Sequence, residues 1–154
     1  MQPRLDFWKA DPKLMNAVLA LNKAATESGL EHSLIHLVKL RASQINGCSY
    51  CVDMHTKEAR KDGESEQRLY LVSAWRESPL FTERERAAFA WTEKLTLLAS
   101  GPVDDALYAR ALEHFSEQDL VKLTVLVGVI NVWNRLCVSF HAVHSVTAAA
   151  SVAA

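Results

Sequence analysis

The sequence has few of the residues that form tight turns. Its 154 residues include only 5 glycines and 4 prolines, and no Asn-Gly or Asp-Gly pair separates two segments of alternating hydrophobicity. Chains built from β-hairpins need such turn residues at regular intervals. We therefore expect an all-α fold, a helical bundle in which nearly every segment is helix.

Neither positive nor negative residues are in excess. The 17 Lys and Arg residues almost balance the 18 Asp and Glu residues, and no basic run could follow a phosphate backbone, so we expect no nucleic-acid partner. The longest apolar run, Val125 to Ile130, is far shorter than a bilayer-spanning segment. The N-terminal residues are partly acidic and have no apolar signal core, so we expect a cytoplasmic protein without membrane partners.

A chain of this length forms one ordinary domain. Hydrophobic residues make up 49% of it, which is enough for a substantial core. No internal repeat or linker divides the sequence, so we expect a single domain over residues 1–154. The four tryptophans are typical of a core or an interface and do not form a cofactor-binding pattern.

Capping and stop signals divide the chain into seven expected helices. They run from Pro12 to about Ser28, from a cap at Ser33 to about Asn46, from Cys48 to Gly63, from Ser65 to about Ser73, from a capping box at Thr82 to Ser100, from Asp104 to Phe115, and from Glu117 to about Ala150. The last segment is rich in β-branched residues and could be a buried strand by pattern alone. Because no partner strands are evident, we interpret it as a buried helix, with Gly128 either a close packing point or merely a weak position.

Two of the three cysteines, Cys48 and Cys51, form a C-x-x-C, and His55 follows four residues later. Positions i, i+3 and i+7 share one face of a helix, and side chains tilt towards the helix N-terminus, so His55 leans back towards Cys51. Unpaired backbone N–H groups in a first helical turn favour a thiolate, and a nearby imidazole can take its proton. The pattern predicts redox chemistry in which one thiolate attacks and the other resolves. Position at the helix end favours Cys48 as the attacking thiol, whereas the histidine favours Cys51, and we give the histidine more weight.

A metal site is the main competing interpretation. His36, Cys48, Cys51 and His55 are residue types that bind zinc. However, three of them lie on one continuous helix, where Cys48 and His55 are separated by roughly 10 Å along the axis, which is hard to reconcile with bonds to a single ion. We therefore expect no metal and no bound organic cofactor. The same objection applies to Cys137, His141 and His144 on the last helix, where Cys137 is better explained as a small buried apolar residue.

The stretch LVKLRASQINGCSYCVDMHTKEAR resembles the core motif of the alkylhydroperoxidase D-like group of the carboxymuconolactone decarboxylase superfamily, with a match from about Leu34 to Gly63. INVWNR, from Ile130 to Arg135, is similar to the same group. The resemblance implies an all-α fold with a helical hairpin that carries the C-x-x-C, assembled as a homo-oligomer such as a trimer or hexamer. Members reduce hydroperoxides with the dithiol and pass electrons from a lipoylated protein to a peroxiredoxin.

By the same resemblance, Cys51 is the attacking thiol, Cys48 resolves, and His55 belongs to a proton relay. Two positions depart from the pattern: His36 replaces a usual glutamate, and Tyr50 replaces a histidine found in some members. Tyr50 can still donate or accept a hydrogen bond. Because histidine titrates near pH 6.5, we expect His36 to shift the pH dependence of the relay, which a comparison of thiolate formation in His36→Glu would test.

Three functions follow, in decreasing order of preference. The first is a thiol-dependent peroxidase or disulfide reductase in antioxidant defence, acting on hydroperoxides through Cys51, Cys48 and His55, with help from Tyr50 and His36 and an external dithiol as reductant. The second is a non-catalytic redox sensor or adaptor oligomer. The third is a lactone decarboxylase, against which the C-x-x-C argues.

Overall fold

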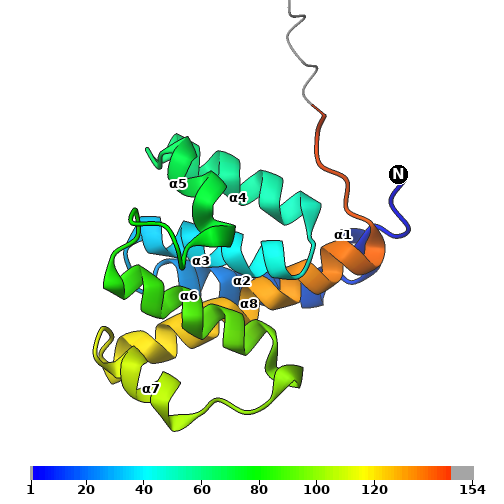
Figure 1. Cartoon of the computed structure of the whole chain (residues 1–154). Coiled ribbons are helices and arrows are strands. Elements are labelled where there is room, and N and C mark those ends of the chain that lie inside the picture. The colour runs from blue at the N-terminus through cyan, green and yellow to red at the C-terminus, as the bar shows by residue number, and fades with distance from the viewer. Residues whose placement is uncertain (1, 147–154) are drawn as a thin grey trace, which may run out of the picture.

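The computed structural model describes residues 2–146 as a bundle of helices with no strand in that range (Figure 1). The helices are α1 (Phe7–Ala10), α2 (Pro12–Thr26), α3 (His32–Ile45), α4 (Ser49–Lys61), α5 (Glu66–Leu71), α6 (Glu83–Thr96), α7 (Asp105–Leu112) and α8 (Glu117–Phe140), with short 3-10 turns η1 (Val72–Ala74) and η2 (Leu98–Ser100). The all-α prediction is confirmed.

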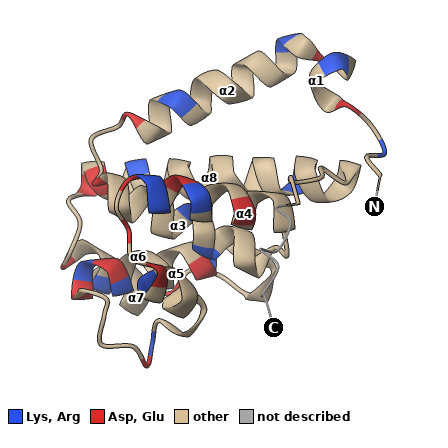
Figure 2. Ribbon diagram, turned by 90° about the horizontal axis from the view of Figure 1, so that it is seen from above, with Lys and Arg blue, Asp and Glu red and all other residues tan. Residues whose placement is uncertain are grey.

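Helices α3, α6 and α8 pack against one another at the centre of the bundle. Their apolar faces form the main core, in which Val38, Leu123 and Leu126 are fully buried. α4 packs antiparallel against α3 as a helical hairpin, and α2 lies alongside α8 (Figures 1 and 2). The N-terminal segment returns to the end of α8, where the Arg4 N–H donates to the Phe140 carbonyl at 2.9 Å.

Most helix starts are where the capping residues predict them. Asp11, Ser65 and Ser116 accept backbone N–H bonds at the N-termini of α2, α5 and α8, and Thr82 forms the predicted capping box with Glu85. The predicted cap at Ser33 is wrong. The N-cap of α3 is Glu31, two residues earlier, and the Ser33 hydroxyl instead donates to the Glu64 carboxylate at 2.8 Å.

The predicted end of the last helix is also wrong. α8 ends at Phe140, because His141 adopts a left-handed conformation with φ 55° and ψ 54°. The predicted helix from there to Ala150 fails over residues 142–146, and residues 147–154 lie outside the described part of the chain. Two other ends are shorter than expected: α6 gives way to η2 after Thr96, and α7 stops at Leu112.

Gly128 does not lie at a close packing point within the described chain. It is exposed on α8, and a Cβ atom built on it would meet nothing within 4 Å. The neighbouring Val127 and Val129 are buried in the core. Gly128 therefore lies on the outer side of α8, away from the core.

By length and mean hydropathy, α8 meets the criterion for a membrane-crossing helix, and no other helix within residues 2–146 does. The central helix of a globular domain meets the same criterion, because it is apolar on most sides. Here α8 packs against α2, α3, α6 and α7. Its hydrophobicity is explained by this central position.

Candidate active site

The C-x-x-C lies at the turn between α3 and α4. Gly47 has a φ of 64°, a left-handed conformation that favours glycine and lets the chain reverse after α3. Cys48 is the N-cap of α4, and its Sγ accepts the backbone N–H of Cys51 at 3.3 Å. α4 therefore begins at Ser49, one residue after the predicted start at Cys48, because Cys48 caps the helix and is not itself helical.

A polar network fixes this turn to α8. The Asn46 side-chain amide donates to Asn131 Oδ1 at 3.0 Å and to Asn134 Oδ1 at 2.9 Å, and Asn134 Nδ2 donates to Ser43 Oγ at 3.0 Å. Asn134 is only 1% exposed. A buried amide that is hydrogen-bonded in this way holds one geometry, so the hairpin and α8 are held in one register. Asn131 and Asn134, the two asparagines of INVWNR, therefore hydrogen-bond to the hairpin.

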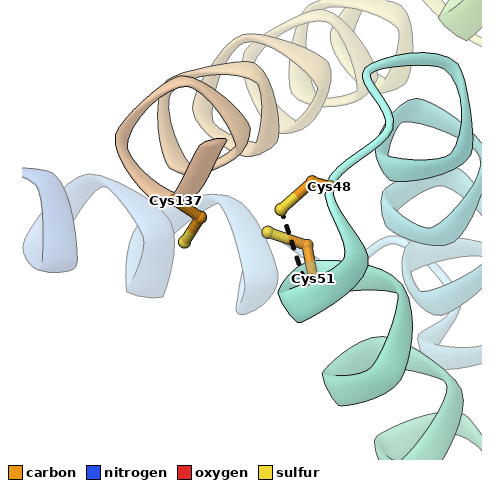
Figure 3. A group of neighbouring side chains, drawn as sticks. All are labelled: Cys48, Cys51 and Cys137. Atoms are coloured by element: carbon orange, nitrogen blue, oxygen red, sulfur yellow. Dashed lines mark hydrogen bonds between the residues drawn. The ribbon is translucent and has the colours of Figure 1, made fainter. Parts of the chain in front are cut away.

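α8 also brings the third cysteine to the C-x-x-C. The sulfur atoms of Cys48, Cys51 and Cys137 lie within 4.8 Å of one another, and all three residues are buried. Figure 3 shows the side chains of Cys48 and Cys51 extending towards the side on which Cys137 projects from α8. Cys137 is therefore more than the small apolar residue that its sequence context suggests.

The three thiols do not share a negative charge equally. Hydrogen bonds from the Cys137 and Cys51 thiols, with the Cys51 N–H and Asn134, lower the pKa of Cys48 despite its burial. The contact with Cys137, followed by the contact with Cys48 and by burial, raises the pKa of Cys51. The contact with Cys48, together with burial, raises the pKa of Cys137. Cys48 is accordingly the preferred position for a thiolate, and Cys51 needs a base to ionise.

His55 is a suitable base. Its Nδ1 lies 2.9 Å from Glu58 Oε2, and because a carboxylate only accepts, Nδ1 carries the proton and Nε2 has the lone pair. His55 Nε2 is buried and has no protein hydrogen-bond partner. Burial lowers the pKa of His55 more than the Glu58 contact raises it, so the imidazole is neutral at neutral pH. The bond from His55 in turn lowers the pKa of Glu58, which stays ionised.

A cavity of about 490 Å³ opens onto this group. Cys51, Cys137, His55 and Glu58 line it, while Cys48 does not. Its remaining wall is largely apolar and comes from the N-terminal segment, α2, α4 and the end of α8, including Leu5, Phe7, Trp8, Leu19, Tyr50, Met54, Trp133, Ala142 and Val143. Trp8 stacks on Trp133 with ring centroids 5.6 Å apart. These two tryptophans therefore help to form a ligand-sized cavity.

The predicted site residues do not all lie together. Cys48, Cys51, Tyr50 and His55 are grouped at the start of α4, with Tyr50 packed against the thiols. His36 lines a separate cleft of about 460 Å³, where its Nε2 lies 2.7 Å from Asp62 Oδ2. Lys39 and Glu58 line both cavities and so form the wall between them.

Two residues of the site were not recognised in the sequence. Glu58 lies three residues after His55, a spacing at which helical side chains meet, so this signal was available. Cys137 comes from a helix distant in sequence, and only the packing of α8 reveals its role. The four residues proposed as zinc ligands do not converge. Within residues 2–146 the metal-compatible group consists of the three cysteines. His141 ends α8, and the predicted helical face with His144 does not form.

An all-α chain whose helical hairpin presents a C-x-x-C to a cavity defines the class of AhpD-like proteins. Residues 12–94 match the model of the carboxymuconolactone decarboxylase family, so the chain belongs to that family. Among curated relatives, the uncharacterised protein YdfG of Bacillus subtilis (strain 168) is 38% identical over 139 residues, covering 90% of this chain and 95% of YdfG. The uncharacterised protein YnjA of Escherichia coli (strain K12) is 36% identical over 108 residues, 70% of this chain and 59% of YnjA.

Solved structures agree with this assignment. A protein of unknown function from Agrobacterium tumefaciens, ATU0492, for which an AhpD-type antioxidant defence role has been suggested, is 49% identical and superposes with a TM-score of 0.92, covering 95% of this chain and all of that one. The debrominase Bmp8, solved with 2,3,4-tribromopyrrole, has a TM-score of 0.75 at 17% identity, covering 86% of this chain and 71% of Bmp8. The second similarity shows a shared fold alone.

Proposed function

We propose that this protein is a thiol-dependent hydroperoxide reductase in which Cys51 is the attacking thiol. The observation that carries the proposal is the pairing, in one cavity, of the Cys51 thiol with a neutral His55 whose Nε2 has no other protein partner. The antioxidant-defence suggestion made for the similar Agrobacterium tumefaciens protein supports the same chemistry.

The reaction begins with proton transfer from the Cys51 thiol to His55 Nε2. The thiolate attacks the terminal oxygen of a hydroperoxide, the O–O bond breaks, and the departing alkoxide takes the proton from His55 to leave as an alcohol. Cys51 is then a sulfenic acid. Because contacts from neighbouring donors lower the pKa of Cys48, its thiolate is ready to attack the Cys51 sulfur. The Cys51 S–O bond breaks, hydroxide leaves with a proton as water, and the Cys48–Cys51 disulfide forms.

Glu58 acts through His55. A charged carboxylate on Nδ1 fixes the tautomer with Nε2 as acceptor and stabilises the imidazolium that forms during the reaction. The family resemblance assigns this role to a glutamate at the position that His36 occupies in this chain. We propose that Glu58 supplies that carboxylate, while His36 and Asp62 form an outer part of the relay on the far side of Glu58.

The cavity favours an organic hydroperoxide over hydrogen peroxide. Its wall is largely apolar, and its volume of about 490 Å³ far exceeds what two oxygen atoms need. Burying an alkyl or aryl group there contributes roughly 25 cal/mol per Å² of apolar surface. We therefore propose alkyl or aryl hydroperoxides as substrates. We also propose a dithiol such as a lipoylated protein as the reductant and a peroxiredoxin as a further acceptor of its electrons. A cytoplasmic location remains a prediction.

The test is consumption of cumene hydroperoxide by purified protein with excess dithiol, beside Cys51→Ser. We expect turnover by the native chain and loss of at least about 100-fold in the variant, because it lacks the attacking thiol. The control is Glu66→Gln, an exposed substitution on α5 outside the cavity, which should leave turnover unchanged.

Two other results would reject the proposed mechanism. If neither protein consumes peroxide while intact mass shows a Cys48–Cys51 disulfide forming, a redox sensor or adaptor is the better explanation. If Cys51→Ser consumes peroxide as fast as the native chain, Cys51 is not the attacking thiol and the proposed mechanism fails.

A further inference from the structure

We propose that Cys137 is a third redox thiol, which forms a disulfide with Cys51 and so links α4 covalently to α8. The proposal relies on the proposed function only in taking Cys51 as the thiol that becomes oxidised. It assigns a role to a cysteine that the C-x-x-C mechanism does not use.

The first ground is position. The three sulfur atoms lie within 4.8 Å of one another, so any two of them need to approach by at most about 3 Å to reach the length of an S–S bond. Cys51 and Cys137 both line the cavity, whereas Cys48 lies behind them. The Asn46–Asn134 and Asn134–Ser43 hydrogen bonds hold α8 against the hairpin close to Cys137. The two helices therefore keep Cys51 and Cys137 within reach.

The second ground is the chemistry of disulfide exchange. Starting from a Cys48–Cys51 disulfide, the Cys137 thiolate attacks the Cys51 sulfur, the Cys51–Cys137 bond forms, and Cys48 leaves as a thiolate. The proton lost by Cys137 is returned to the thiols or to His55, and no oxidant or reductant is consumed. A disulfide breaks more readily when its leaving sulfur has a low pKa, and Cys48 is the sulfur with stabilising donors around it.

The exchange moves the disulfide to the cavity wall. In a Cys48–Cys51 disulfide, only Cys51 lines the cavity, but in a Cys51–Cys137 disulfide both sulfurs do. An incoming dithiol can then attack either one. Cys137 can also resolve a Cys51 sulfenic acid directly, with water leaving, when Cys48 is missing.

The decisive experiment is oxidation of Cys48→Ser by diamide, which makes disulfides without peroxide. Alkylation under denaturing conditions and peptide mapping then identify the linked residues. We expect an intramolecular Cys51–Cys137 disulfide in this variant, and none in Cys48→Ser/Cys137→Ser.

Native protein provides a second measurement that needs no variant. After oxidation to one disulfide per chain, we expect the Cys51–Cys137 isomer to exceed about a tenth of the oxidised protein. This fraction corresponds to an equilibrium constant within about tenfold of one between the Cys48–Cys51 and Cys51–Cys137 disulfides. The proposal is overturned if Cys48→Ser folds but retains two free thiols or forms intermolecular disulfides alone. It is also overturned if native protein yields Cys48–Cys51 without any link to Cys137.

These outcomes are independent of the peroxidase test. If the Cys51–Cys137 disulfide forms with diamide but no peroxide is consumed, the proposed function fails and the third redox thiol stands. If peroxide is consumed and Cys137 never enters a disulfide, the proposed function stands and the third redox thiol fails.

Discussion

At the scale of single residues, burial determines which groups of the site carry charge. His55 is 3% exposed, and its imidazole has one carboxylate neighbour, Glu58, on Nδ1. Burial keeps the ring neutral, and the carboxylate orients it. A histidine on the surface would be partly protonated near pH 6.5 and could not act as a base to the same degree.

We expect Glu58→Gln to lower the peroxide turnover rate by about tenfold, because the imidazolium loses its stabilising charge. Removing Glu58 also removes a contact that raises the pKa of His55, so that pKa falls further. The acid limb of the pH–rate profile should therefore move to lower pH. Turnover measured across the acidic range checks this.

Glu66→Gln is the matched control for that change. It neutralises an exposed carboxylate on α5 that contacts Arg60 and Tyr70, away from His55. An equal loss of rate in both variants, or an unshifted acid limb in Glu58→Gln, would contradict the positioning role of Glu58.

Lys39 is a second buried ionisable residue beside the site. It is 6% exposed, and its Nζ donates to Thr26 Oγ1 at 3.1 Å. Burial lowers the pKa of Lys39, because desolvation penalises the ammonium more than the Glu58 charge favours it. We expect Lys39→Met to raise the free energy of unfolding at neutral pH by about 1 kcal/mol.

This gain should depend on pH. Since the folded-state pKa of Lys39 is below 10.5, the unfolded chain binds the proton more tightly, and native stability rises with pH between those two values. The difference between Lys39→Met and native protein should therefore shrink at alkaline pH. Urea unfolding at neutral and alkaline pH measures this difference in the free energy of unfolding. A difference that grows as the pH rises would contradict the prediction.

At the scale of elements, the C-terminus of α8 is decided by one residue. His141 has positive φ and is the sole non-glycine residue among residues 2–146 to do so. A side chain in this conformation costs about 1–2 kcal/mol, which glycine avoids. We expect His141→Gly to raise the free energy of unfolding by about 1 kcal/mol and the Tm by about 2–4 °C.

His141→Ala is the control for that prediction, because alanine also carries a Cβ atom and gains nothing from the substitution. Thermal unfolding followed by circular dichroism compares the three proteins. If alanine stabilises as much as glycine, the histidine ring and not the backbone conformation is responsible.

At the scale of the whole molecule, α8 presents an apolar stripe to the outside. Val121, Val125 and Val132 are 64%, 37% and 39% exposed, and Gly128 lies between them on the same helical face. An apolar stripe on the surface of a stable domain is typical of a subunit contact. This is consistent with the predicted trimer or hexamer, which remains a prediction.

We expect Val125→Glu to shift the protein to a smaller species in size-exclusion chromatography with light scattering, because a buried, unpaired carboxylate opposes association. Leu98→Glu places the same charge on another exposed apolar residue, in η2, and should leave the oligomer unchanged. A monomeric native protein would contradict the predicted assembly.

Much of the site follows from local sequence. The start of α4 at Cys48, the reversal at Gly47 and the buried face shared by Cys51 and His55 are all set by capping residues and helical periodicity. The His55–Glu58 pair belongs to the same class of short-range contact, although it was overlooked. The helix starts at Asp11, Thr82 and Ser116 are equally local.

The sequence by itself therefore determined the all-α fold, most helix starts and the dithiol at the start of α4, because each depends on interactions between residues close along the chain. Only the tertiary structure brought Cys137 to the dithiol, separated His36 from it and enclosed the cavity between the N-terminal segment and the end of α8. The position of Cys137 and the cavity depend on how α8 packs against α3 and α4, and the position of His36 depends on how α3 and α4 pair. Such contacts join residues distant in sequence, and the spacing of residues along one helix does not encode them.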